Sequence, residues 1–136
     1  MHTVGTFAPD TLEEAREQYD SVGPAAQTVV REVARAMDFD REEYGDRVSS
    51  DVVETARDAL FASLLTVHVA SREEYDEWRD GYDGEVIEAG SEHVDNVAWH
   101  AGPADEAVAA TFQEQEEAAI ATLRRQAFGR LYREQL

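Results

Sequence analysis

The densest run of apolar residues lies in the middle of the chain, and its spacing changes partway along. Val53, Ala56, Leu60 and Leu64 recur at three- and four-residue intervals, which is the pattern of one face of a helix. From residue 65 onward the apolar side chains alternate, which is the pattern of a strand. We therefore predict a helix over 50–64 that leads directly into a strand over 65–70, with both in the core.

Helices are also predicted before this segment. Thr11 and Glu14 have the spacing of a capping box, and Pro24 stands at a natural first position of a helix. The sequence predicts helices over 11–20, 24–37 and 40–47. Five apolar residues are expected to line one face of the second of these: Ala26, Val29, Val30, Val33 and Met37.

After the central segment, helical and strand patterns alternate. Ser71 and Glu74 form another capping-box pattern, and Gly81 suits a helix end. The predicted elements are a helix over 72–80, strands over 85–89, 94–101 and 107–112, and a long helix over 113–133. Together they indicate a single α+β domain over 1–136, in which helices pack with a small, mostly antiparallel sheet and the last helix covers one face of it.

Charge narrows the environment for which the protein is built. The 136 residues include 30 acidic side chains and 12 basic ones, giving a net charge of −18; every basic residue is Arg, and Cys is absent. Self-repulsion at such a charge is relieved by salt, because the Debye length falls to about 3 Å at 1 M. We expect a cytoplasmic protein of a salt-in halophile, with no signal peptide and no membrane span.

Missing residue types exclude several chemistries. Without Lys there is no phosphate-binding GxxxxGK[ST] loop or Schiff base, and without Cys there is no thiol nucleophile. Dinucleotide-binding GxGxxG and zinc-binding HExxH motifs are also absent. We therefore expect no cofactor, assign no catalytic residue, and favour a non-enzymatic protein.

Two other functions stay open at this stage. One is a small enzyme or metal-binding protein that uses His68, His93 and His100, because imidazole is a common ligand of zinc, manganese and iron. The other is a regulator resembling a helix-turn-helix protein, in which the helix over 50–64 would read the DNA. The charge argues against nucleic-acid binding, since that helix is net negative and phosphates repel it.

The end of the chain differs from the rest in charge. Between residues 118 and 133 there are four Arg and no acidic residue, interleaved with aromatic side chains. Such a segment either docks on the chain's own sheet or binds an acidic partner, for example a second copy. The candidate partner-binding residues are Arg124, Arg125, Phe128, Arg130, Tyr132 and Arg133.

Three segments carry a resemblance to a known family: SDVVETARDALFASLL, DNVAWHAGP and ATLRRQAFGRLYR. They resemble an uncharacterised haloarchaeal family of small acidic proteins, classed as a domain of unknown function. The resemblance implies a salt-rich cytoplasm and brings no catalytic residue, cofactor or partner. The interpretation favoured by the sequence is a binding or assembly module, for which a homodimer formed through the C-terminal helix or a sheet edge is one candidate form.

Overall fold

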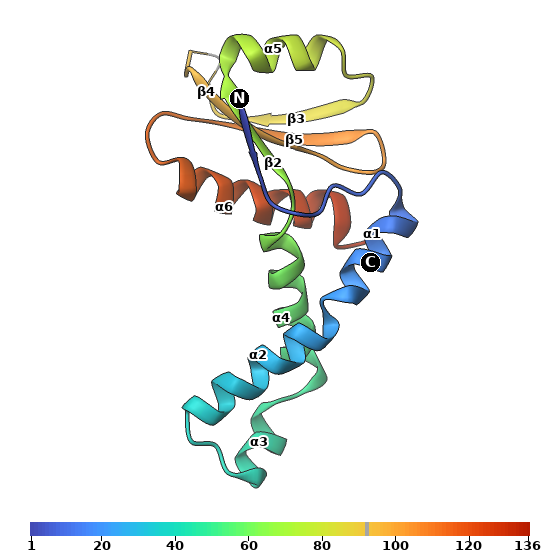
Figure 1. Cartoon of the computed structure of the whole chain (residues 1–136), viewed down its shortest axis with the longest axis vertical. Helices are drawn as coiled ribbons and strands as arrows, with labels where there is room; N and C mark the ends of the chain where they lie inside the picture. The colour runs from blue at the N-terminus through green and yellow to red at the C-terminus, as the bar shows by residue number, and fades with distance from the viewer. Residues whose placement is uncertain (92) are drawn as a thin grey trace.

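The computed structural model describes residues 1–91 and 93–136 and has two parts, a sheet with helices on both faces and a helical arm that projects from it (Figure 1). We call these parts the body and the arm. The arm consists of three helices: α2 (Gly23–Ala36), α3 (Arg41–Arg47) and α4 (Ser50–Ser63). The α+β class predicted from the sequence is confirmed.

The body contains a five-stranded sheet in the order β1-β2-β4-β5-β3. Its strands are β1 (His2–Val4), β2 (Val67–Ser71), β3 (Glu85–Ala89), β4 (Asn96–Ala101) and β5 (Glu106–Phe112). Neighbouring strands are antiparallel except β3 and β5, which run parallel. The sheet is therefore mostly antiparallel, as predicted, with one strand more than the sequence indicated.

Helices close both faces of this sheet. The helix α5 (Arg72–Asp80) covers one face, and α6 (Glu116–Ala127) covers the other (Figure 1). The short α1 (Leu12–Ser21) packs against α4, and its Arg16 Nε donates to the Gln135 carbonyl oxygen near the C-terminus at 3.2 Å. At the N-terminus of α5, the Ser71 hydroxyl and the Glu74 side chain form the reciprocal hydrogen bonds of the predicted capping box.

Three predicted element starts are wrong by two or three residues, and one of them is the strand expected over 94–101, which begins at Asn96. The strand expected from residue 65 begins at Val67, because Leu65 pairs in an isolated bridge with Phe7. The helix expected over 113–133 begins at Glu116, and its last turns, Phe128–Tyr132, are a π-helix. This π turn directs Phe128, Leu131 and Tyr132 into the core.

The central segment is interior where the sequence predicted it. Phe61, Leu65 and Val67 are fully buried, and Val69 is nearly so. Leu60 and Leu64 are partly buried and pack against the same cluster. The chain thus turns from helix to strand inside the core, and the rest of the body packs around that turn.

Candidate functional site

The three candidate metal ligands do not come together. His68 lies opposite Trp99 in the register of β2 and β4, so it shares the α5 face of the sheet with that ring. His100, the next residue along β4, points to the opposite face because side chains alternate along a strand. His93 is exposed in the connection between β3 and β4. Within residues 1–91 and 93–136, no three His, Asp or Glu side chains are grouped as a metal site requires.

His100 instead forms part of the buried core. Its Nδ1 lies 2.6 Å from the Thr66 carbonyl oxygen, so this nitrogen must donate. Its Nε2, 2.5 Å from the Tyr132 hydroxyl, then accepts from that group. Burial is the main cause that lowers the pKa of His100 to about 4, and the imidazole is therefore neutral near pH 7.

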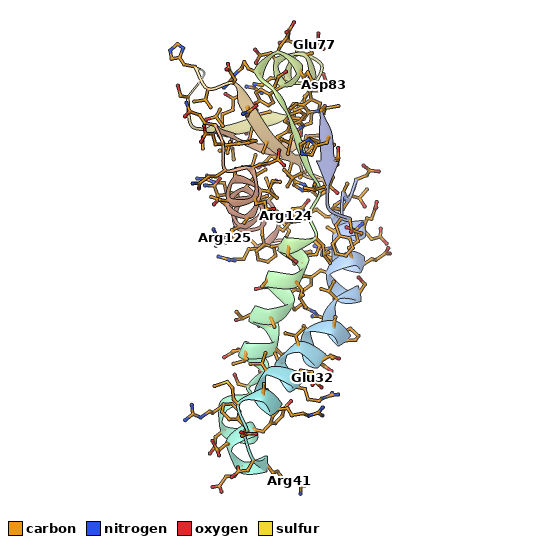
Figure 2. All side chains as sticks on the ribbon, turned by 60° about the vertical axis from the view of Figure 1, so that its left-hand side comes forward. Glu32, Arg41, Glu77, Asp83, Arg124 and Arg125 are labelled. Atoms are coloured by element: carbon orange, nitrogen blue, oxygen red, sulfur yellow. The ribbon has the colours of Figure 1, made fainter. Side chains whose placement is uncertain are left out.

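The Arg-rich C-terminal segment is divided between core and surface. Phe128 and Tyr132 are buried in the chain's own core, so their rings are not available to a partner. The Arg124 Nε donates to the Leu65 carbonyl oxygen at 2.9 Å, which ties α6 to the turn between α4 and β2 (Figure 2). Arg125, Arg130 and Arg133 are exposed. For these three arginines, partner binding stays a prediction.

A small cavity between α5 and the ends of β3 and β5 contains an acid–base pair. The Tyr75 hydroxyl donates to Glu88 at 2.5 Å, and Arg79 pairs with the same carboxylate at 2.9 Å. Burial and the Glu88 hydrogen bond raise the pKa of Tyr75. The cavity measures about 40 Å³, and a single water needs about 10–15 Å³. It has room for a few waters and none for an organic substrate.

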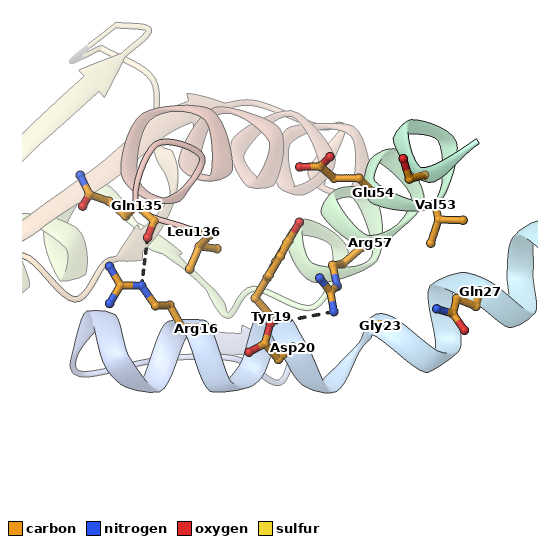
Figure 3. A pocket seen from close by; sticks show the side chains of 11 residues that line it. Arg16, Tyr19, Asp20, Gly23, Gln27, Val53, Glu54, Arg57, Gln135 and Leu136 are labelled. Carbon is orange, nitrogen blue, oxygen red and sulfur yellow. Dashed lines mark hydrogen bonds and ion pairs between the residues drawn. The ribbon is translucent and has the colours of Figure 1, made fainter. Parts of the chain in front are cut away.

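A larger groove of about 670 Å³ lies where the arm joins the body (Figure 3). Gln27 of α2 and Glu54 and Arg57 of α4 line it, together with Tyr19 and Asp20 of α1. Its charges are mixed, with two Arg and two acidic side chains along the wall. The groove therefore has no net charge that would select an anion or a cation.

Arg57 braces this junction. Its guanidinium lies 4.8 Å from the centre of the Tyr19 ring and 3.9 Å from an Asp20 oxygen. A Cβ at Gly23 would come within 2.5 Å of its Nη2, so glycine leaves the space that the guanidinium occupies. The Tyr19 hydroxyl donates to Asp58 at 2.6 Å; burial, followed by this bond, raises the pKa of Tyr19 to about 12. These contacts fix the direction of the arm.

The opposite side of the arm carries the most unusual surface. Residues a third to half a turn from Gln27 on α2 and from Arg57 on α4 face away from the groove, and Met37, the C-cap residue of α2, extends this surface about 80° from Gln27. We call this surface the charge-free flank: nine uncharged, exposed side chains form it, and the exposed acids Glu32 of α2 and Asp51 of α4 lie at its borders. Its residues are Ala25, Val29, Val33, Ala36 and Met37 on α2, and Val52, Thr55, Ala59 and Ser63 on α4.

Three of these side chains belong to the single apolar face that the sequence predicted for this helix. Val29 is 44%, Val33 53% and Met37 58% exposed, whereas Val30 is buried. The predicted five-residue face of α2 is thus split: the part containing Val30 packs on α4, and the other part is open to solvent. Sequence reasoning missed this surface because the pattern of apolar residues does not show which element, if any, packs against them.

The remaining observations concern the whole chain. In the described part of the protein, no helix has both the length and the apolar character to cross a bilayer. No curated protein and no solved structure matches the chain. The family model described as "Family of unknown function (DUF5809)" matches residues 6–133, and the chain belongs to that family.

Proposed function

We propose that this protein is a non-enzymatic assembly module that forms a homodimer through the charge-free flank of its arm. The observation that carries the proposal is the composition of that flank. Charged residues make up 31% of the chain, yet at this surface the exposed charges of Glu32 and Asp51 lie only at the border of nine uncharged, exposed positions. Depletion of charge together with exposed Val and Met is characteristic of the centre of a protein–protein interface.

The surface area of the chain supports a partner of substantial size. A compact monomer of 15.2 kDa exposes about 7,100 Å² by the usual scaling of surface with mass. This chain exposes 8491 Å², an excess of about 1,400 Å² over that scaling. A stable interface buries about 800 Å² on each partner. Covering one side of the arm would bring the exposed area close to that of an ordinary globular protein.

A second copy is the occupant that we favour. An uncharged flank on a molecule of net charge −18 is a place where two copies meet without repulsion between facing side chains. The two edges of the sheet are less suitable, since β3 presents the exposed Glu85 and Glu88 and β1 has only three residues. The dimer proposed from the sequence is retained, and its interface moves from the C-terminal helix or sheet edge to the arm.

The two alternative functions have less support. A shared metal site would need His68 and His100 on one side of the sheet, and they lie on opposite faces. A DNA-reading helix would need exposed basic side chains on α4. Its exposed charges are Asp51 and Glu54, whereas Arg57 lies against Gly23. Phosphates would be repelled by such a surface.

We also propose that the protein works in the salt-rich cytoplasm of a halophile. The support is the charge of −18, with Arg as the only basic residue type. Screening of this charge should stabilise both the fold and the dimer. Raising KCl from 0.1 to 2 M (about a fourfold decrease in Debye length) should raise the melting temperature. A melting temperature that does not change would contradict this part of the proposal.

Light scattering in 2 M KCl (a concentration chosen for strong screening) tests the dimer. The unsubstituted protein should have twice the mass of one chain. The variant Val33→Asp places a charge on the flank and should be monomeric, with dimer affinity reduced at least about 100-fold by the buried charge. Thr28→Asp is the matched control on the exposed opposite side of α2 and should stay dimeric. A monomeric unsubstituted protein, or a dimeric Val33→Asp variant, would disprove the proposal.

A further inference from the structure

We propose that the two arms bind in opposite directions, with a twofold axis near Val33, so that the dimer holds its two bodies apart. This inference rests on the proposed function, because it specifies how a second copy lies on the charge-free flank. It also gives that assembly a form: a bivalent connector with one identical sheet body at each end.

The spacing along α2 is symmetric about Val33. Val29 and Met37, the large apolar residues on either side of it, are each four positions away. A dimer with twofold symmetry uses the same patch on both chains. In the antiparallel arrangement Val33 meets Val33 of the second copy, and Val29 meets Met37 of the second copy on both sides of the axis. All three apolar side chains are then covered in one contact.

The charge distribution favours this direction. Residues 23–63, which form the arm, carry nine acidic side chains and five Arg, whereas the rest of the chain carries 21 and seven. The body therefore holds most of the net negative charge. Two parallel arms, packed with their helix axes about 8–10 Å apart, would place the two bodies side by side. That arrangement brings the strongest repulsion in the molecule into the dimer.

Antiparallel arms remove this repulsion. Val33 is ten residues from Gly23, where the arm leaves the body. With a rise of 1.5 Å per residue, the two arm bases are about 30 Å apart along the helix axis. This separation exceeds the Debye length, which is about 8 Å at 0.15 M salt and about 3 Å at 1 M. The bodies then scarcely repel each other, and the groove beside each arm stays open because it lies on the other side of the helix pair.

Engineered cysteines give a direct test, since the chain has no Cys of its own. A disulfide forms only between Cα atoms about 4.4–6.8 Å apart. After mild oxidation in 2 M KCl (strong screening), Val33→Cys should form a covalent dimer. Val29→Cys alone and Met37→Cys alone should remain largely uncrosslinked, whereas an equal mixture of the two should crosslink. Thr28→Cys, on the other side of α2, is the control and should not crosslink.

The possible results separate this inference from the proposed function. Covalent dimers of Val29→Cys alone and of Met37→Cys alone, with little mixed product, mean parallel arms. The flank would then be the interface and only the direction would be wrong. A light-scattering dimer in which no flank cysteine crosslinks places the contact elsewhere and overturns both. A monomer by light scattering overturns the proposed function itself.

Discussion

The body and the arm bury their apolar residues to very different degrees. In the body, clusters on both faces of the sheet are closed, and Leu65, Trp99 and Leu123 have almost no exposed surface. In the arm, α3 has no buried residue in its whole length, and α2 leaves half of its apolar stripe open. The body therefore has the core of an independent domain, whereas the arm is a surface built on a support.

The two parts share one helix, and this explains how an arm without its own core stays straight. The last turns of α4 enter the body, where Phe61 is completely buried. Its first turns lie far from the sheet, beside α2 and α3 (Figure 1). The position of the arm is thus fixed by the body's core and by the Arg57 brace, and the flank is free for binding.

The largest effect is expected from Phe61→Ala. The Phe61 ring meets four aromatic rings, those of Phe7, Tyr19, Phe128 and Tyr132, at centroid distances of 5.3 to 5.9 Å. Removing it leaves a cavity where arm and body join and should lower the free energy of unfolding by about 3–5 kcal/mol. Denaturant titration in molar KCl, at a concentration where the dimer has dissociated, measures this loss.

Val33→Ala is the comparison in the arm. Because Val33 is exposed in the single chain, the same measurement should show a change within about 0.5 kcal/mol. Equal losses for the two variants would mean that the arm has a core of its own, and the contrast between the two parts would fail.

The next effect is a dependence on pH that belongs to the body. The folded chain holds the pKa of His100 at about 4, below the ordinary value of 6.5. Between these pH values the imidazole is protonated in the unfolded chain and neutral in the folded chain. The contribution of His100 to the free energy of unfolding is therefore fully present above pH 6.5 and is lost as the pH falls toward 4. At about 1.36 kcal/mol per unit, the loss from this group is about 3 kcal/mol.

His100→Gln isolates this contribution, since it keeps a polar side chain and cannot titrate. As the pH falls from 7 to 4, the free energy of unfolding of the unsubstituted protein should decrease more than that of His100→Gln. If the two proteins lose stability in parallel as the pH falls, His100 is not a neutral core residue.

Local patterns predicted the elements well because each signal concerns residues that are close in sequence. The helix over 72–80 and the strand over 85–89 have the predicted bounds, as expected where a capping box or a glycine marks an end. The parallel pairing of β3 with β5 was beyond such reasoning, since strand order depends on contacts across the whole chain. The strand β1, which the sequence did not predict, has three residues, and these are too few for a periodic signal.

The functional residues were harder to predict, for a related reason. The metal hypothesis failed to allow for alternation between faces, which separates His68 from His100 once their strands pair. The C-terminal rings of Phe128 and Tyr132 gave the same pattern whether they faced the chain's own sheet or a partner. On α2, the apolar face is wider than the surface that α4 covers. Only the position of α4 shows which apolar residues of α2 stay exposed to solvent.

The smallest effect compares one kind of change in the two parts. The Ser71 hydroxyl accepts from the Glu74 amide at 3.2 Å at the start of α5, and the Asp40 carboxylate accepts from the Glu43 amide at 2.8 Å at the start of α3. Losing either cap weakens its helix by about 1 kcal/mol. Ser71→Ala should lower the global unfolding free energy by that amount, because α5 covers a face of the sheet.

Asp40→Ala should leave global stability nearly unchanged, because α3 has no buried residue and opens without disturbing the core. Hydrogen exchange should instead show faster exchange confined to the amides of α3. If Asp40→Ala lowered global stability as much as Ser71→Ala, the tip of the arm would be coupled to the body. The arm would then be part of one cooperative unit, and its open flank would be harder to explain as a surface kept for a partner.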